Sequence, residues 1–329
     1  MVAYSSSIDF WCPKISRLLR LGTVFGTPKY CVMRSYRKWR THKKSTFFSS
    51  STLDFCKGSD KNIVLEGFIL DMKIIKVLML GDVIGNPGME QLYIKLPQFI
   101  KKENIDLVIA NGENSDNGFG ITEEIIDRMR GFGVTVITSG NHIWSNQDAE
   151  ALLNHYDFVL RPHNYYDSPG KGFWIGEVAG EKIAVVNLIG RYFITPVDCP
   201  FQILEKLLRK ELRGIKNIIV DFHAEIMPEK KSLAYYFDGK VSFVAGTHTH
   251  VQTADDIILG NGTGYITDLG MCGGLDSVIG MEKKGILHKI RRNVNVPYVP
   301  SNENEKMQGI IIDLNLDTGK TESIQRFSM

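Results

Sequence analysis

Residues 241–250 read Val-Ser-Phe-Val-Ala-Gly-Thr-His-Thr-His and place two histidines directly after a short apolar run. An apolar run of this length is typical of a buried strand, and Gly246 marks its exit into a loop. Because neutral imidazole is a frequent metal ligand, His248 and His250 indicate a metal site at the end of that strand. Two exposed loop histidines are the alternative, and this stretch alone does not choose between them.

The same arrangement recurs from Met72 onward, where short β-branched runs alternate with polar-apolar stretches. This alternation predicts an α/β domain over residues 72–329, without a repeat or a linker. We expect strands at 74–80, 107–110, 134–138, 182–188, 217–220, 241–245 and 264–267, and a closing hairpin from 308–314 and 323–327. We expect helices at 89–102, 122–132, 147–155 with Asn146 as its cap, and 201–213.

Five of the expected strands are followed by polar side chains that can bind a metal. Sites in α/β sheets collect at the carboxyl ends of strands, where loops bring distant residues together. Each residue has a structural alternative when taken singly, such as a helix cap for Asp82 or a core histidine for His223. Their occurrence in order, each directly after an apolar run, favours one joint site. The candidates are Asp82, Glu113, Asn114, Asn141, His142, His223, His248 and His250.

The types of candidate ligand indicate the chemistry. An aspartate, a glutamate, asparagine oxygens and imidazoles without a thiolate suit manganese, iron or zinc better than a structural cysteine-type zinc site. The set is larger than one tetrahedral ion needs, which favours two metal ions with a bridging carboxylate. Such a pair, about 3.5–4 Å apart, holds a hydroxide and clamps the oxygens of an in-line phosphoryl displacement.

The charge of the chain is unevenly distributed. Residues 1–71 carry 12 Lys and Arg against 5 Asp and Glu, whereas the whole chain carries 39 against 37. We interpret 1–71 as a basic, Ser-rich leader that is disordered or reflects a misplaced start site, because Met72 looks like a natural beginning. An organelle-targeting peptide and a nucleic-acid-binding tail are the alternatives for this stretch.

Composition also constrains the cellular environment. The chain has five cysteines with no regular spacing, which favours a reducing compartment, and we expect a cytoplasmic protein. No run of about 18 apolar residues occurs, so we expect no membrane-spanning helix.

The ordered blocks resemble the calcineurin-like metallophosphoesterases and are most similar to their YmdB-like branch of bacterial phosphodiesterases. The resemblance covers residues 72–329 and none of 1–71. The blocks that carry it are Gly81-Asp-Val-Ile-Gly85, Asn111-Gly-Glu-Asn114, Gly140-Asn-His-Ile-Trp144, Asp221-Phe-His-Ala-Glu225 and the stretch 246–255.

The resemblance implies a fold and a function. The fold would be an αββα sandwich of two mixed β-sheets flanked by helices, with the metals at one sheet edge. The function would be phosphodiester hydrolysis, with 2′,3′-cyclic nucleotides as the characteristic substrates and two ions, iron or manganese before zinc, as cofactors. In the implied mechanism a metal-bridging hydroxide attacks phosphorus, and the metals offset charge on the equatorial oxygens.

The resemblance also implies a role for each candidate. Asp82 and His250 would hold one ion, Glu113 would bridge the two ions, and Asn114 would lie at the first ion or touch phosphate. The second ion would be held by Asn141, His223 and His248. His142 would be the general acid that protonates the leaving oxygen, and imidazole suits this role because it exchanges protons near neutral pH.

Three positions differ from the residues that are common in the metallophosphoesterase superfamily or in its YmdB-like branch. Ile84 stands where most of the superfamily has a histidine, and Glu113 stands where it has an aspartate. Both changes are expected within the YmdB-like branch, but they leave the identity of the metal open. His163, where the branch more often has alanine, has two interpretations: a residue at the mouth of the site, or a surface-loop histidine, which we favour.

Two other functions stay open from the sequence. A phosphomonoesterase or nucleotidase would use the same two metals, and only the pocket shape would differ. A regulatory module that binds RNA or protein through a vestigial site is the second alternative, because the basic leader would attract phosphates. We therefore expect a small phosphodiester as the main partner, with RNA and a second copy of the chain as further candidates.

Overall fold

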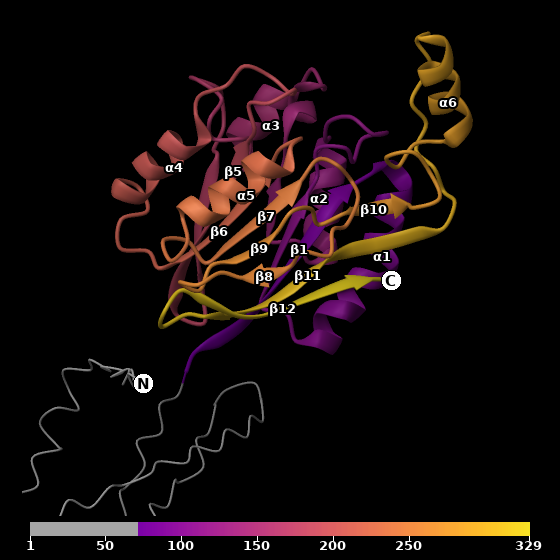
Figure 1. Ribbon diagram of the computed structural model, residues 1–329. Helices are drawn as coiled ribbons and strands as arrows, with labels where there is room; N and C mark the ends of the chain where they lie inside the picture. The colour runs from indigo at the N-terminus through magenta and orange to yellow at the C-terminus, as the bar shows by residue number, and fades with distance from the viewer. Residues whose placement is uncertain (1–71) are drawn as a thin grey trace, which may run out of the picture. The chain divides into compact units, whose positions relative to one another are not determined.

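The computed structural model describes residues 72–329, and the predicted leader at 1–71 lies outside the described residues. Two six-stranded sheets and the helices that cover them make up this part of the chain (Figure 1). The elements are β1 (Ile74–Val83), α1 (Gly85–Glu103), β2 (Leu107–Asn111), α2 (Glu123–Phe132), β3 (Val136–Thr138), η1 (Asn141–Trp144), α3 (Ala149–His155), β4 (Phe173–Val178), β5 (Glu181–Ile189), α4 (Pro200–Arg209), β6 (Asn217–His223), α5 (Met227–Tyr236), β7 (Phe243–Thr247), β8 (Ile257–Ile258), β9 (Gly264–Ile266), β10 (Met271–Gly274), α6 (Lys283–Arg292), β11 (Glu305–Asn315) and β12 (Lys320–Ser328).

Both sheets are mixed. In the first sheet the strand order is β12-β11-β10-β1-β2-β3, and β1 pairs parallel with β2 and β10 but antiparallel with β11. In the second sheet the order is β4-β5-β6-β7-β9-β8, with a parallel centre from β5 to β9 and antiparallel edge strands. The parallel centres matter for function because they direct the carboxyl ends of neighbouring strands to the same edge.

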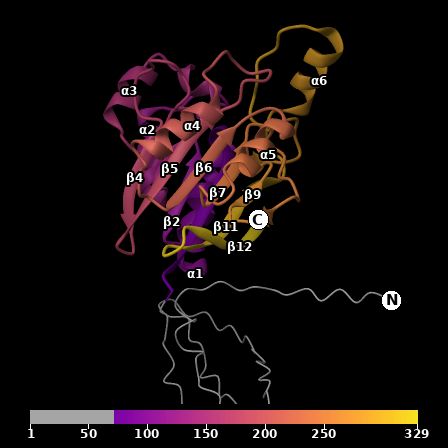
Figure 2. The ribbon, with the colours of Figure 1, turned by 60° about the vertical axis from the view of Figure 1, so that its left-hand side comes forward.

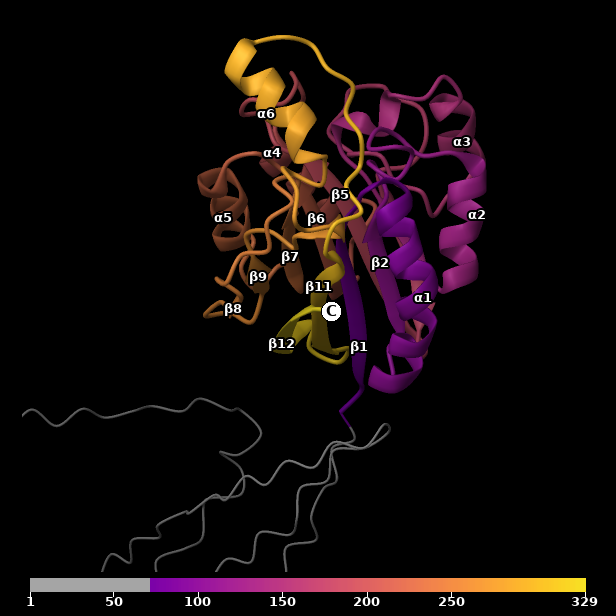
Figure 3. The same cartoon turned by 90° about the vertical axis from the view of Figure 1, so that its right-hand side faces the viewer.

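The sheets stack face to face, with helices on both outer faces. Figure 3 shows α1, α2 and α3 on one side of the stack, and Figure 2 shows α4 and α5 across the second sheet. Alternate residues of β1 demonstrate the layering, since Val77 and Met79 join the cluster between the sheets whereas Leu78 and Leu80 pack under the helices. Both faces are buried from Val77 onward, which explains the continuous apolar run Val77–Leu80.

This arrangement confirms the predicted αββα sandwich of two mixed sheets. Helix α2 illustrates how local signals set its bounds: the hydroxyl of Thr122 accepts a hydrogen bond from the Ile125 amide at 3.4 Å, and Gly133 ends the helix at φ 108°. The seven expected strands and the closing hairpin all exist, and four of the strands extend further than expected.

Several expected bounds were wrong. Helix α1 begins at Gly85 rather than at residue 89, and α4 ends at Arg209 rather than at 213. Asn146 does not cap α3, because its side-chain amide instead donates to the Ile121 carbonyl at 2.8 Å and holds the loop before α2. Tertiary hydrogen bonding overrides the local capping signal at this position.

The sequence did not predict β4, β8, β10, α5 or α6. Strand β4 lies at a sheet edge, is only partly buried, and has an apolar run of just three residues, Phe173–Ile175. Helix α6 is largely exposed and projects from the sandwich in Figures 1–3. Within residues 72–329 no helix is both long and apolar enough to cross a membrane.

Candidate metal centre and active site

All eight candidate residues lie at one end of the sandwich, on segments that leave neighbouring strands. The strand register places them side by side, because Asp82 pairs with Asn111, Asn111 with Thr138, and His223 with Thr247. The remaining candidates follow these positions in the chain within a few residues: Glu113, Asn114, Asn141, His142, His248 and His250. The strand ends of two separate sheets thus contribute polar side chains to one cluster.

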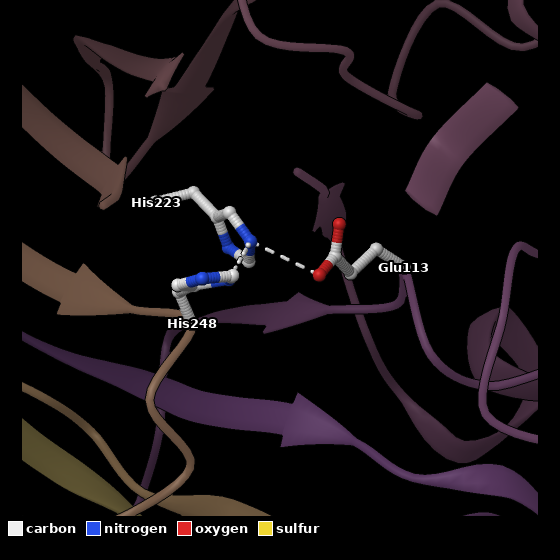
Figure 4. Close-up of side chains that lie close together, drawn as sticks. All are labelled: Glu113, His223 and His248. Atoms are coloured by element: carbon white, nitrogen blue, oxygen red, sulfur yellow. Dashed lines mark hydrogen bonds and ion pairs between the residues drawn. The ribbon is translucent and has the colours of Figure 1, made fainter. Parts of the chain in front are cut away.

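Glu113, His223 and His248 form the closest group (Figure 4). The Nε2 atom of His223 lies 3.0 Å from Oε1 of Glu113 and 3.0 Å from Nδ1 of His248. The three potential ligand atoms all lie within 4.8 Å of one another, which is a spacing that one metal ion can span. The glutamate comes from the first sheet and both imidazoles from the second.

Asp82 and His250 form the neighbouring pair. Oδ1 of the fully buried Asp82 lies 3.8 Å from Nε2 of His250, and its Oδ2 accepts the His248 amide at 3.2 Å. Oδ1 of Asp82 also lies 3.8 Å from Nδ1 of His223, so the pair adjoins the group of Glu113, His223 and His248, and the division of these ligands between two ions stays a prediction.

Four buried oxygen atoms of the site have no hydrogen-bond partner among the described residues. They belong to candidate metal ligands and are Asp82 Oδ1, Glu113 Oε1, Asn114 Oδ1 and Asn141 Oδ1. Buried polar atoms are nearly always hydrogen-bonded, because desolvation without a partner costs about 1–3 kcal/mol or more for each group. Four unpartnered acceptors in one place fit the binding of cations, which accept oxygen lone pairs directly.

Hydrogen bonds at the Nδ1 atoms orient the imidazoles of His223 and His250. The hydroxyl of Thr247 donates to Asp221 at 2.7 Å, so its free lone pair accepts from Nδ1 of His223 at 3.0 Å. Nδ1 of His250 donates in the same way to the Ile279 carbonyl at 2.9 Å. These bonds assign the proton to Nδ1 and leave both Nε2 atoms unprotonated, as a metal ligand requires, with Nε2 of His223 accepting the 3.0 Å hydrogen bond from Nδ1 of His248.

Burial shifts the pKa values of the carboxyl groups and of the imidazoles at this site in opposite directions. Burial, followed by the neighbouring charge of Glu113, raises the pKa of Asp82 well above its ordinary value, and burial also raises the pKa of Glu113. Burial lowers the pKa of His223 well below its ordinary value and that of His248 to about 3. The imidazoles of His223 and His248 are therefore neutral and do not supply the positive charge that a metal ion would bring to the two carboxylates.

Close backbone packing brings the strand ends together. A side chain at Gly140 would place a Cβ 2.2 Å from Nε2 of His223 and 2.5 Å from Oε2 of Glu113, so only glycine fits before Asn141. His248 and His250 have φ angles of 99° and 63°, which L-residues rarely adopt. Such strain persists where surrounding contacts hold it, and it concentrates at functional sites.

A buried ion pair holds the loop that carries these two histidines. The Lys230 ammonium donates to Asp268 at 2.9 Å and to the Thr247 carbonyl at 2.7 Å, and both residues of the pair are fully buried. Asp268 in turn accepts the amide and the hydroxyl of Thr249, at 3.1 and 2.7 Å. Thr249 lies between His248 and His250, so this pair positions both imidazoles.

A cavity of about 190 Å³ opens above the cluster and is bordered by five of the candidates. His142 is one of them, and its amide donates to Oε2 of Glu113 at 2.9 Å, which fixes the backbone beside the cluster. The five candidates that line the cavity are Glu113, Asn114, His142, His248 and His250. A larger cavity of about 570 Å³ beside α3 contains none of the eight.

Two of the three unusual positions noted in the sequence, Ile84 and His163, lie in well-defined packing environments. Ile84 is fully buried against Met271 and Met281, so the position that carries a histidine elsewhere is part of an apolar cluster here. His163 does not line the cavity, and the favoured surface-loop interpretation is also inaccurate. Its half-buried ring packs edge-on against Phe173 at 5.4 Å, and burial lowers its pKa to about 4.

Comparison with known proteins places this chain in a family. The sequence profile of the YmdB-like protein family matches residues 78–327. The chain belongs to the YmdB-like family. It is 37% identical over 253 residues to a 2′,3′-cyclic-nucleotide 2′-phosphodiesterase from Bacillus subtilis, an alignment that covers 77% of this chain and 96% of the relative.

Solved structures agree with the family assignment. A phosphatase from Mycoplasma pneumoniae superposes with a TM-score of 0.75 at 33% identity, over 78% of this chain and 94% of that chain. A hypothetical protein from Thermus thermophilus superposes with a TM-score of 0.72 at 38% identity, over 78% and 99% of the two chains. The metallophosphoesterase-type sandwich of this YmdB-like protein is therefore shared with a phosphatase of known structure.

Some residues of the site were missed in the sequence. Asp221 is two positions before His223 in β6 and so lies on the same face of that strand, which was a usable signal. Its carboxylate accepts hydrogen bonds from Thr247, Thr138 and the Asn111 amide, and burial raises its pKa to about 6. The Lys230–Asp268 pair had no comparable signal, because α5 was not predicted.

Proposed function

We propose that this chain is a metal-dependent phosphodiesterase that hydrolyses 2′,3′-cyclic nucleotides. The observation that carries the proposal is the set of four unpartnered buried oxygens in the cluster that contains His223 and His248, next to a cavity that Glu113 and Asn114 border. The Bacillus subtilis relative, which is named for this activity and aligns over nearly its whole length, supports the choice of substrate class.

Two metal ions are proposed to bind this cluster, with iron or manganese favoured over zinc by the mixed oxygen and nitrogen donors. Asp82, His250 and Asn114 would hold one ion, and Glu113 would contribute to both. Asn141, His223 and His248 would hold the other. When bound, the ions supply positive charge to the phosphate oxygens and activate the water that attacks phosphorus.

His142 is the proposed general acid. It lines the cavity beside Glu113, and its ring is fixed by an edge-on contact with Phe119 at a centroid distance of 4.8 Å. The side chain therefore faces the space where substrate binds. From there it protonates the ribose oxygen that leaves phosphorus, which prevents the build-up of negative charge on that oxygen.

Metal analysis combined with a substrate panel tests the proposal. We expect the full chain, purified and loaded with manganese or iron, to hydrolyse 2′,3′-cyclic AMP much faster than adenosine monophosphates. Cleavage of the monophosphates alone would instead identify a phosphomonoesterase with the same metal core. Loss of cyclic-nucleotide hydrolysis after chelation, with recovery on addition of metal, is the matched control for metal dependence.

A further inference from the structure

The cavity above the candidate metal centre has two chemically different sides. Its floor carries the carboxylate, amide and imidazole groups of the centre. Its wall carries no charged side chain and consists of Phe119, Ile279, Met281 and Tyr298. A ligand that fits both sides combines an anionic group with an uncharged, apolar group.

Aromatic rings extend the wall outward from the proposed general acid. The ring of Phe119 contacts His142 on one side and Tyr298 on the other, with centroid distances of 4.8 and 5.4 Å. Phe119 follows β2, whereas Tyr298 follows α6, so the wall joins two segments that are far apart in sequence. The ammonium of Lys289 in α6 lies 4.3 Å from the Tyr298 centroid and hydrogen-bonds its hydroxyl, which holds this ring in place.

Ile279 connects the wall to the floor. Its carbonyl accepts the hydrogen bond that orients His250, while its side chain lines the cavity and is 49% exposed. The residue has a φ of 52°, which is an outlier for a β-branched side chain. An apolar, β-branched residue is therefore held in a strained conformation at the border between the metal centre and the wall.

We propose that this wall binds the nucleobase of the substrate, an inference that rests on the proposed phosphodiesterase function. A nucleoside cyclic phosphate joins an anionic phosphate to a planar, uncharged base through a ribose, which matches the two sides of the cavity. Aromatic side chains bind bases through their faces, and every base has such a face. The hydroxyl of Tyr298, the wall's polar side-chain group, is already bonded to Lys289, so the wall accepts purines and pyrimidines alike.

The test compares substrates with and without a base. The metal-loaded full chain is assayed with adenosine and cytidine 2′,3′-cyclic phosphates and with methyl riboside 2′,3′-cyclic phosphate, which has no base. Stacking of a base is worth about 1–3 kcal/mol, so we expect the two nucleotides to have a kcat/KM roughly tenfold above that of the riboside. Equal values for nucleotides and riboside would overturn the base site while leaving phosphodiesterase activity intact.

Variants of Tyr298 test whether the wall carries the preference for substrates with a base. Tyr298→Ala is expected to raise KM for both nucleotides roughly tenfold, with kcat and the riboside unchanged, because it removes stacking surface and no reacting group. Tyr298→Phe keeps the ring and its contact with the Lys289 ammonium while losing the hydroxyl, and is expected to keep most of the preference for nucleotides over the riboside. Tyr166→Ala, at a tyrosine that is 83% exposed and outside the cavity, is the matched control. Equal loss for nucleotides and riboside in Tyr298→Ala would overturn the proposal.

A binding measurement separates this inference from the proposed function. Isothermal titration calorimetry of the metal-loaded chain with adenosine 3′-monophosphate and with ribose 3-phosphate measures how much the base contributes to binding affinity, without turnover. If no phosphodiester were hydrolysed, the proposed function would fail on its own. Tighter binding of the nucleotide that is lost in Tyr298→Ala would still support the base site, and equal affinities would overturn it.

Discussion

The two sheets contribute chemically different halves of the candidate metal centre. The first sheet supplies oxygen donors, from β1, from the segment after β2 and from the segment after β3. The second sheet supplies nitrogen donors, from the end of β6 and the loop after β7. The oxygen donors are Asp82, Glu113, Asn114 and Asn141, and the nitrogen donors are His223, His248 and His250.

Ionised carboxylates in the oxygen half are electrostatically unfavourable without a neighbouring cation. Burial raises the pKa of Asp82 and of Glu113, which shows that their negative charge lacks compensation. Burial lowers the pKa of His223 and of His248, so the imidazoles do not supply that compensation by protonation. The contrast teaches that the sandwich brings together an oxygen set and a nitrogen set, neither of which offsets the charge of the other, and this supports the proposed metal ions.

Removing one ligand from either half should have the largest effect. We expect Asp82→Ala and His223→Ala each to bind fewer than two ions per chain and to lose turnover, because a bridged pair of ions needs both donor sets. Metal quantitation on purified protein measures the result. His155→Ala, an exposed histidine at the end of α3, is the control and should keep its metal. A full metal complement in either ligand variant would contradict the assignment.

Replacing the proposed acid should separate binding from catalysis. His142→Ala is expected to keep both ions, because His142 belongs to neither donor set, but to lower turnover by about 10²- to 10⁴-fold, which is the usual contribution of a general acid. Metal content and kcat, measured on the same preparation, give the answer. Near-normal turnover with full metal content would remove the general-acid role.

Disturbing the orientation of one imidazole should have the smallest effect of the three. Thr247→Val keeps the shape of the side chain but removes the oxygen that accepts from His223, and we expect metal affinity to fall by about 10- to 100-fold. Competition with a chelator of known affinity measures this change. Thr318→Val, in the exposed turn between β11 and β12 at the opposite end of the sandwich, is the matched control. Unchanged affinity in Thr247→Val would show that the threonine does not orient the ligand.

Much of the fold was predictable because central strands carry their signal locally. Strands β5 to β7 are buried on both faces and read as continuous apolar runs, so their positions follow from the sequence. The edge strand β4 and the projecting helix α6 lack this signal because few of their residues are buried. Their conformation depends on neighbouring segments that the local sequence does not encode.

The candidate site was predictable for a related reason. Asp82, Glu113 and His248 each follow an apolar run, and the carboxyl ends of parallel strands converge. The groups that support these residues carry no such pattern, because each acts through a contact with a distant segment. Asp268, for example, reaches Lys230 in α5 across 38 positions of sequence.

The sequence by itself determined the strand pattern, the family and the donor types at the strand ends, because these depend on local composition and order. Only the tertiary structure decided which donors meet, how Thr247 and Ile279 set the protonated nitrogen of two imidazoles, and which apolar side chains border the cavity. The physical reason is that these features arise from packing between two sheets and from the φ angles of the connecting loops. His248 and His250 illustrate both levels: the sequence predicts them as metal ligands, and the fold places His248 against His223 and His250 near Asp82.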